Sequence, residues 1–213
     1  MILDGIKNIV FDLGGVLVDL DKQRCIDAFT AIGFPQSAKL IDFYYPIEIF
    51  NKLEKGEATT ADVCKFIRTE AGREDLTDEQ ITAAYSAFLL DIPIYKLRML
   101  RDLRLCGFKI YLLSNTNEIM MPYVLDTLLT ADGATAADYF DKIYLSFEMK
   151  ELKPSPTIFR KMLDDSGMKV EETLFLDDGA KNIDTARAMG FQVYMPQPRE
   201  DFRFLFDEVL NKN

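Results

Sequence analysis

The stretch NIVFDLGGVLV, residues 8–18, decides the fold of this 213-residue chain. An apolar run long enough for one buried strand ends abruptly at Asp12, and the pair Gly14 and Gly15 follows. Such a run is typical of a parallel strand that is covered on both faces. In an open α/β sheet, the carboxyl end of such a strand is where a nucleophile can be presented to a ligand. The stretch therefore predicts a reactive aspartate at the edge of a parallel sheet.

Four further apolar runs of strand length occur along the chain, and a polar or glycine-containing turn follows each. They cover residues 109–113, 142–145, 173–176 and 192–195. Amphipathic helical patterns separate most of them, and those at 94–105 and 180–189 end just before a glycine. This alternation predicts an α/β fold, a doubly wound parallel sheet of five strands with helices on both faces.

The segment between the first and second predicted strands is far longer than a crossover, which needs on the order of a dozen residues. Helical patterns fill it at residues 22–32, 37–44, 47–55, 60–71 and 77–89. Within the last of these, Thr77 and Gln80 form a predicted capping box. We therefore expect a helical cap domain, residues 21–91, inserted into a core formed by residues 1–20 and 92–213.

Composition excludes several classes of function. The chain has 25 Lys and Arg against 35 Asp and Glu, a net charge of −10, which disfavours binding to nucleic acid or to an anionic membrane. It has no histidine, and Cys25, Cys64 and Cys106 lack paired spacing, so neither a zinc site nor a disulfide framework is expected. No segment approaches the roughly 18 apolar residues of a membrane span, and no export signal is visible. We expect a cytoplasmic protein, monomer or dimer, without nucleic-acid or membrane partners.

Acidic and polar side chains follow four of the predicted strands. They are Asp12, Ser114, Asn115, Ser146, Asp177 and Asp178. Taken singly, each is explained as a cap, a turn residue or a solvated acid, because such residues are common in loops. The carboxyl ends of parallel strands meet in one crevice, however, so together these residues predict a shared site.

Four motifs in this order resemble those of the haloacid dehalogenase superfamily, which comprises aspartate-nucleophile hydrolases, mostly phosphatases. They are residues 11–17 (FDLGGVL), 113–117 (LSNTN), 152–156 (LKPSP) and 175–183 (FLDDGAKNI). The resemblance covers nearly the whole chain, and the second and fourth motifs are similar to those of bacterial sugar-phosphate phosphatases such as alpha-glucose-1-phosphate phosphatase. It implies a Rossmann-like core with an inserted cap, and a Mg²⁺-dependent phosphatase whose substrate is a small phosphorylated metabolite, a sugar phosphate.

The resemblance implies that Asp12 attacks phosphorus and forms an aspartyl phosphate, which splits one difficult displacement into two easier ones. A carboxylate and a phosphate dianion repel each other, so Mg²⁺ is expected between them. Its ligands would be Asp12, the carbonyl of Gly14 and Asp178. Asp177 would bind it directly or through water.

The same resemblance assigns the binding of the phosphoryl group to Ser114 and Lys153, aided by Asn115 and backbone N–H groups. These donors would meet the charge that spreads over the phosphoryl oxygens in the transition state. Gly15 either lets the backbone approach the phosphate or serves only as a turn glycine.

Gly14 departs from the family pattern, because most phosphatases of the superfamily carry an aspartate there. That aspartate protonates the leaving alcohol and then activates water, and general acid–base catalysis of this kind contributes about 10²–10⁴-fold. One interpretation is a phosphatase whose leaving group needs little protonation, such as an anomeric hydroxyl, or one that uses another acid: Asp19, Asp21 or a cap residue. A 2-haloacid dehalogenase is a second, disfavoured by the intact pair Asp177 and Asp178. A binding protein without turnover is the third.

Two groups of residues near these motifs have a structural explanation that we prefer. Asp19 and Asp21 suit a helix amino terminus, where acids are favoured. An aromatic cluster in the cap is more often packed than substrate-reading. The candidates for substrate contact there are Tyr44, Tyr45, Phe50 and Lys52.

Overall fold

The computed structural model describes residues 3–39 and 47–210. Its centre is a five-stranded sheet in the order β3-β2-β1-β4-β5, with every neighbouring pair parallel. This confirms the predicted α/β fold. The strands are β1 (Asn8–Phe11), β2 (Lys109–Ser114), β3 (Lys142–Leu145), β4 (Thr173–Leu176) and β5 (Gln192–Tyr194).

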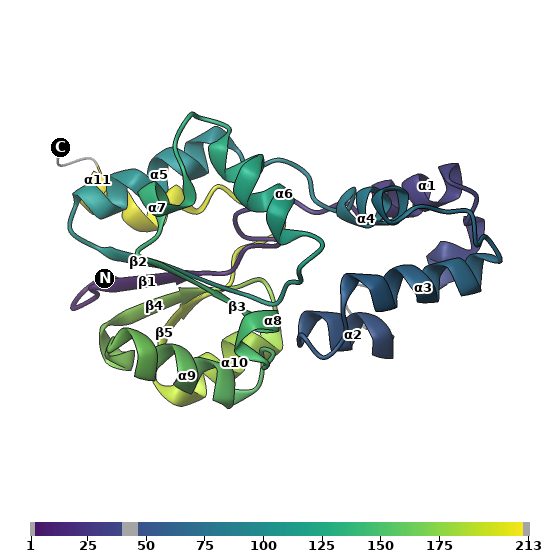
Figure 1. The fold of residues 1–213 in the computed structure, drawn as a ribbon. Helices are drawn as coiled ribbons and strands as arrows, with labels where there is room; N and C mark the ends of the chain where they lie inside the picture. Colours follow the sequence, from purple (N-terminus) through teal and green to yellow (C-terminus); the bar gives the residue numbers. More distant parts are fainter. Residues whose placement is uncertain (1–2, 40–46, 211–213) are drawn as a thin grey trace.

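The central strand β1 explains why the chain makes a two-sided sheet. All four of its residues are buried, and alternate side chains enter different cores: Ile9 and Phe11 one, Val10 the other. A strand covered on both faces has a continuous apolar run, as residues 9–11 do. Helices cover both faces of the sheet (Figure 1). They are α5 (Ile94–Leu105), α7 (Ala136–Tyr139) and α11 (Asp207–Leu210) on one face, and α9 (Pro156–Ser166) and α10 (Ala180–Met189) on the other.

Four helices lie together beyond the carboxyl ends of the strands, apart from the sheet (Figure 1). We call them the helical insert. They are α1 (Lys22–Ala31), α2 (Glu48–Glu54), α3 (Thr60–Ala71) and α4 (Asp78–Ser86). The capping box of Thr77 and Gln80 at the start of α4 is confirmed. The domain limits 1–20, 21–91 and 92–213 stay a prediction.

The predicted helix 37–44 differs from the structure. Its described part belongs to a 3₁₀ helix, Pro35–Lys39, and the remainder, with Tyr44 and Tyr45, lies outside the described residues. Phe50 of α2 is 2% exposed and stacks on Tyr85 of α4 at 5.2 Å between ring centroids. Phe50 is therefore a packing residue of the helical insert, as the structural explanation predicted.

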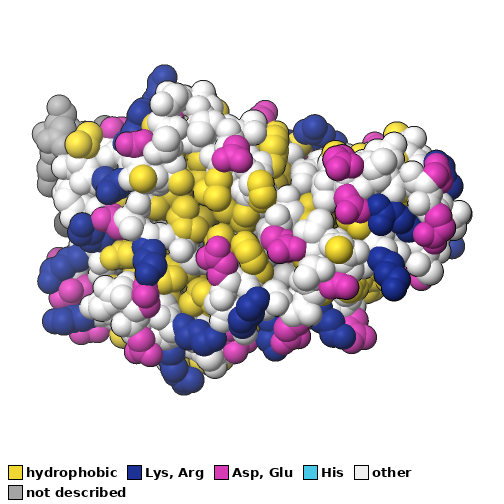
Figure 2. Space-filling view, in the orientation of Figure 1, with side chains coloured by type: hydrophobic (Ala, Val, Ile, Leu, Met, Phe, Trp, Pro, Cys, Tyr) yellow, Lys and Arg dark blue, Asp and Glu magenta, His cyan; other side chains and the backbone are white. Residues whose placement is uncertain are grey.

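The remaining short helices lie between or after the later strands. They are α6 (Met121–Asp126) and α8 (Ser146–Met149), with short 3₁₀ turns at Leu128–Thr130, Val170–Glu172 and Phe202–Phe206. On the face shown in Figure 2, charged side chains of both signs are scattered widely and hydrophobic side chains gather in the middle. In the part of the chain that the structure describes, no helix has the length and apolar character needed to cross a membrane.

Candidate active site

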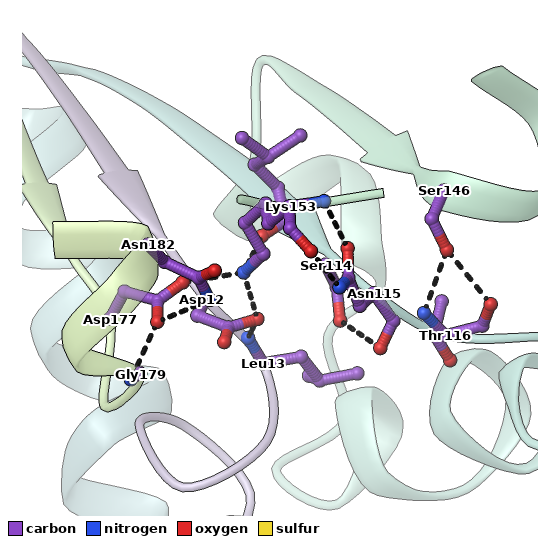
Figure 3. Close-up of polar contacts among 11 residues, drawn as sticks. Asp12, Leu13, Ser114, Asn115, Thr116, Ser146, Lys153, Asp177, Gly179 and Asn182 are labelled. Atoms are coloured by element: carbon purple, nitrogen blue, oxygen red, sulfur yellow. Dashed lines mark hydrogen bonds and ion pairs between the residues drawn. The ribbon is translucent and has the colours of Figure 1, made fainter. Parts of the chain in front are cut away.

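Strand register brings the predicted site residues to one edge of the sheet. Phe11, the last residue of β1, is paired with Leu112 of β2 on one side and with Leu176 of β4 on the other. β1 and β4 therefore end at the same level, and β2 continues for two more residues to Ser114. Asp12 and Asp177 are immediate neighbours of the sheet edge, and Ser114 ends β2 beside them (Figure 3).

Lys153 joins the two acids. Its Nζ lies 2.9 Å from Oδ1 of Asp12 and 2.6 Å from Oδ2 of Asp177, and it also donates to the carbonyl of Leu113 at 2.9 Å. The side chain is completely buried, which disfavours its charge, but the two carboxylates outweigh burial and raise the pKa of Lys153. An ammonium group has three donors. All three of them are engaged.

Asn115 holds Lys153 in place from β2. Its Nδ2 donates to the carbonyl of Lys153 at 2.9 Å, and its Oδ1 accepts from the N–H of Lys153 at 2.8 Å (Figure 3). Two bonds between one side-chain amide and one peptide unit fix the direction in which the lysine leaves the backbone. Asn115 thus positions Lys153, and its predicted contact with phosphate stays a prediction.

Asp12, the predicted nucleophile, has one carboxylate oxygen held by donors. Oδ1 accepts from the N–H of Leu13 at 2.7 Å and from Lys153. Burial raises the pKa of Asp12 well above its usual value, the ion pair with Lys153 opposes this, and the neighbouring Asp177 and Asp178 raise it further. Burial is therefore the main cause that disfavours the charged form of Asp12, and the two neighbouring carboxylates add to it.

Asp177 and Asp178 are adjacent in sequence but have different environments. Asp177 is fully buried, and its Oδ1 accepts from the N–H of Gly179 at 2.8 Å and from Nδ2 of Asn182 at 2.9 Å. Asp178 is exposed toward the cavity, where crowding by protein atoms and the charge of Asp177 raise its pKa. Asp177 is thus locked by donors, and Asp178 is available to a ligand.

The three acids fit a divalent cation. Asp12, Asp177 and Asp178 each place one carboxylate oxygen within 4.8 Å of the others. Lys153 contacts two of them, and its single positive charge does not offset the charges of three carboxylates. Carboxylate oxygens are hard ligands of the type that Mg²⁺ prefers.

The two glycines after Asp12 have different roles. Gly15 has φ +72°, and a Cβ there would overlap Oδ2 of Asp178. The residue is therefore a turn glycine that also lets the loop pack against Asp178. At Gly14 a Cβ would lie 3.1 Å from Cδ1 of Leu20, so an apolar side chain lies where the family acid would begin.

The acids proposed as substitutes near the nucleophile are used elsewhere. Asp21 is the N-cap of α1 and accepts from the N–H of Gln23 at 2.9 Å. Asp19 lies 3.8 Å from Nζ of Lys96, which is buried and donates to the carbonyl of Val16 at 2.6 Å. The helix-entry explanation is confirmed for Asp21. Neither acid lines the cavity above Asp12.

A cavity of about 410 Å³ opens over the sheet edge. Asp12, Gly14, Ser114 and Asp178 contribute to one part of its wall. The other part comes from the helical insert and its connections: Leu20, Glu54, Phe88 and Leu89. Ser114 is buried and its Oγ makes one long bond of 3.4 Å, to the carbonyl of Asn115.

Glu54 is the cavity residue that sequence reasoning missed. It is the last residue of α2, and burial raises its pKa to about 7, with Lys153 opposing the shift. The sequence carries only a weak signal for it, an acid near the end of a helical pattern and two residues before Gly56. Lys52, which the sequence offered as a substrate contact, instead pairs with Glu48 at 2.5 Å on the surface of α2.

Ser146 was expected in the shared crevice, but it is fully buried and does not line the cavity. Its Oγ accepts from the N–H of Thr116 at 3.0 Å and donates to the carbonyl of Glu54 at 2.6 Å. Ser146 therefore connects the core to the helical insert, and takes no direct part in the cavity.

Comparison with known proteins agrees with this geometry. A model of the haloacid dehalogenase-like hydrolases matches residues 6–190. Among curated proteins, the D-ribitol-5-phosphate phosphatase of Bacteroides thetaiotaomicron is 37% identical over 206 residues, which span 97% of this chain and 99% of that protein.

Solved structures give the same result. A haloacid dehalogenase family enzyme of Bacteroides thetaiotaomicron, solved as an aspartate-to-alanine mutant with magnesium and inorganic phosphate, is 41% identical with a TM-score of 0.91, covering 94% of this chain and 98% of that one. A haloacid dehalogenase-like hydrolase of Porphyromonas gingivalis is 36% identical with a TM-score of 0.87, covering 98% and 99%. The similarity thus extends over almost the whole chain.

Proposed function

Because this chain belongs to the haloacid dehalogenase-like hydrolases, we propose that it is a Mg²⁺-dependent phosphatase of a small sugar or polyol phosphate. The observation that carries the proposal is a cluster of three acids at the carboxyl ends of β1 and β4, with Lys153 in contact with two of them. The acids are Asp12, Asp177 and Asp178. The name of the curated relative supports a pentitol phosphate, and we place the reaction in the cytoplasm.

In the first step, Oδ2 of Asp12 attacks phosphorus while Oδ1 stays with Leu13 and Lys153. The carboxylate gives up its charge as the acyl phosphate forms, so its attraction for Lys153 falls. One N–H of Lys153 is then released toward the phosphoryl oxygens, where charge has collected. Ser114 adds a donor, because the bond from its Oγ to the carbonyl of Asn115 is long, at 3.4 Å, and is easily exchanged.

Asp12, Asp178 and the carbonyl of Gly14 would hold Mg²⁺, with Asp177 reached through water because its own oxygens already accept from Lys153, Gly179 and Asn182. When bound, the ion supplies positive charge between the nucleophile and the phosphate. Asp177 also keeps Lys153 charged and correctly placed.

The proposal is tested by assaying free phosphate release from pentitol and sugar phosphates with Mg²⁺ and with a chelator. We expect turnover with Mg²⁺, its loss with the chelator, and a preference for a linear pentitol phosphate. If no phosphate ester is hydrolysed with Mg²⁺, the result would indicate a binding protein without turnover. Chloride release from a 2-chloroacid in the presence of the chelator would instead indicate a dehalogenase.

A preference for anomeric phosphates would support the first explanation of Gly14, in which the leaving group needs little protonation. A preference for the phosphate of a primary alcohol would require an acid, because an alkoxide leaves poorly unless it is protonated. The substrate panel therefore also decides whether the absence of an acid at Gly14 has to be compensated elsewhere.

A further inference from the structure

The proposed function leaves one chemical requirement without a residue, and the inference that follows rests on that function. The phosphate ester of a primary alcohol needs a proton on its bridging oxygen as the P–O bond breaks, and the acyl phosphate then needs a base to activate water. Gly14 can do neither. Of the described residues, three acids line the cavity: Asp12, Asp178 and Glu54. The first two already serve as nucleophile and metal ligand, which leaves Glu54.

Glu54 reaches the cavity from the helical insert. It ends α2, whose last turn lies opposite α8 beyond the carboxyl ends of the strands (Figure 1). The cavity is thus enclosed by Asp12 and Ser114 from the sheet and by Glu54 from α2. A substrate whose phosphorus lies over Asp12 must direct its leaving group away from the nucleophile, because attack and departure are roughly in line. The helical insert contributes the wall in that part of the cavity.

The core fixes the segment that carries Glu54 by three contacts. Ser146 donates to the carbonyl of Glu54 at 2.6 Å, and Lys150 donates to the carbonyl of Gly56 at 2.7 Å. Glu118 accepts from the N–H of Thr60 at 2.5 Å, at the start of α3. The bond to Ser146 is made at Glu54 itself, so the position of its backbone is set by the core that also holds Asp12.

The charged and titratable groups around Glu54 allow it to exchange a proton near neutral pH. Lys153 faces it from the core and favours the carboxylate, whereas burial favours the acid. Tyr85 of α4 is close enough for Glu54 to raise the pKa of its phenol, and Asp12 and Asp178 lie in the same cavity. The result is a pKa of about 7, which suits a group that must first give and then take a proton.

We propose that Glu54 is the general acid and base of this phosphatase, in place of the aspartate that the family carries at Gly14. In the first half-reaction, the Glu54 carboxyl proton moves to the bridging oxygen as the bond from that oxygen to phosphorus breaks and the bond from Asp12 to phosphorus forms. The alcohol leaves neutral and Glu54 is left as carboxylate. In the second, Glu54 takes a proton from water while the water oxygen bonds to phosphorus and the bond to Asp12 breaks. Inorganic phosphate leaves, and Glu54 is again protonated.

The test compares Glu54→Gln with Glu57→Gln, an exposed glutamate in the same segment that pairs with Lys55. Ribitol 5-phosphate serves as the alkyl substrate and p-nitrophenyl phosphate as the aryl one, whose leaving group is stable as an anion. For Glu54→Gln we expect kcat on the alkyl ester to fall about 10²–10⁴-fold. With the aryl ester we expect a burst of one equivalent of nitrophenolate followed by slow turnover, because the acyl phosphate forms but is hydrolysed slowly. Glu57→Gln should behave as wild type with both.

The pH profile gives a second readout. Wild-type kcat/KM for the alkyl ester should decline above about pH 7, and Glu54→Gln should lack that limb. Glu54→Asp should recover part of kcat. A kcat equal to that of wild type, or a change confined to KM on both esters, would overturn the proposal and make Glu54 a substrate contact. Failure of the wild-type protein to hydrolyse either ester would refute the proposed function itself. Thermal unfolding serves as the control that each variant is folded.

Discussion

The two walls of the cavity are built in different ways. On the sheet side, Asp12 and Asp177 are tied to one buried lysine and to backbone donors, so almost every polar atom already has a partner. On the helical side, Glu54 has its backbone anchored by Ser146, and the dominant influence on its carboxyl group is burial. The difference teaches that one wall is organised to hold charges still, and the other to let a proton move.

The largest expected effect comes from removing the nucleophile from the first wall. Asp12→Asn keeps the size and the bond from Leu13 but cannot form an acyl phosphate, so we expect turnover to fall by on the order of 10⁴-fold or more. The check is steady-state phosphate release together with trapping of the phosphorylated enzyme by acid quench. Retention of a trapped phosphoenzyme would show that another residue is the nucleophile.

The next largest effect is on stability, and it comes from removing the cation of the sheet-side wall. Lys153→Met leaves Asp12 and Asp177 buried without their cation, which should cost about 3–5 kcal/mol of unfolding free energy at pH 8. Urea unfolding without added metal measures it. Lys52→Met, which breaks an exposed pair with Glu48 on α2, is the control and should leave the unfolding midpoint unchanged. Equal midpoints for the two variants would contradict this account of the buried cluster.

A third prediction concerns Glu54 in the helical wall and the pH dependence of its contribution to stability. The pKa of Glu54 is raised from 4.5 to about 7, so the folded protein binds this proton more tightly than the unfolded chain. The contribution of Glu54 to stability should therefore fall as the pH rises from about 4.5 to about 7. Glu54→Gln lacks this term, so its stability relative to wild type should increase across that window by at most about 3 kcal/mol. Chemical unfolding at several pH values measures the difference, and parallel curves for the two proteins would contradict the raised pKa.

The smallest effect concerns the junction between the walls. Ser146→Ala leaves the carbonyl of Glu54 and the N–H of Thr116 without this partner, which should cost about 1–3 kcal/mol. We also expect a loss of turnover smaller than that of Glu54→Gln, because the acid remains but is less well placed. Ser166→Ala, whose hydroxyl bonds to Met162 within α9, should leave turnover unchanged. A wild-type kcat for Ser146→Ala would show that this bond does not position Glu54.

The sheet-side wall was predictable because it depends on local rules. An apolar run ending in Asp12 and another ending in Asp177 give strand ends at one edge, and parallel pairing then brings the two acids together whatever their separation in sequence. The same reasoning found Ser114, whereas Lys153 was assigned by the resemblance of residues 152–156 to the third family motif. It did not find that Asn115 clamps the backbone of Lys153, since that contact depends on the path of the loop before α9.

Glu54 was not predictable for a related reason. Its place depends on how α2 packs against α8 and on a hydroxyl 92 positions later in the chain, neither of which leaves a periodic pattern. Sequence reasoning left several explanations of Gly14 open, and one of them was that another acid acts in place of the family residue, with a cap residue among the candidates. It also named Asp19 and Asp21, and only the structure shows that these two are turned to other partners.

An acid carried on α2 also has an evolutionary consequence. In a phosphatase whose proton donor lies two residues after the nucleophile, the helices over the cavity are free to diverge without touching the chemistry. Here the end of α2 would contribute both a wall of the substrate cavity and the proton donor. Drift in that short segment would change specificity and rate together, and an exchange of helical inserts between relatives would carry the acid along with the new binding surface.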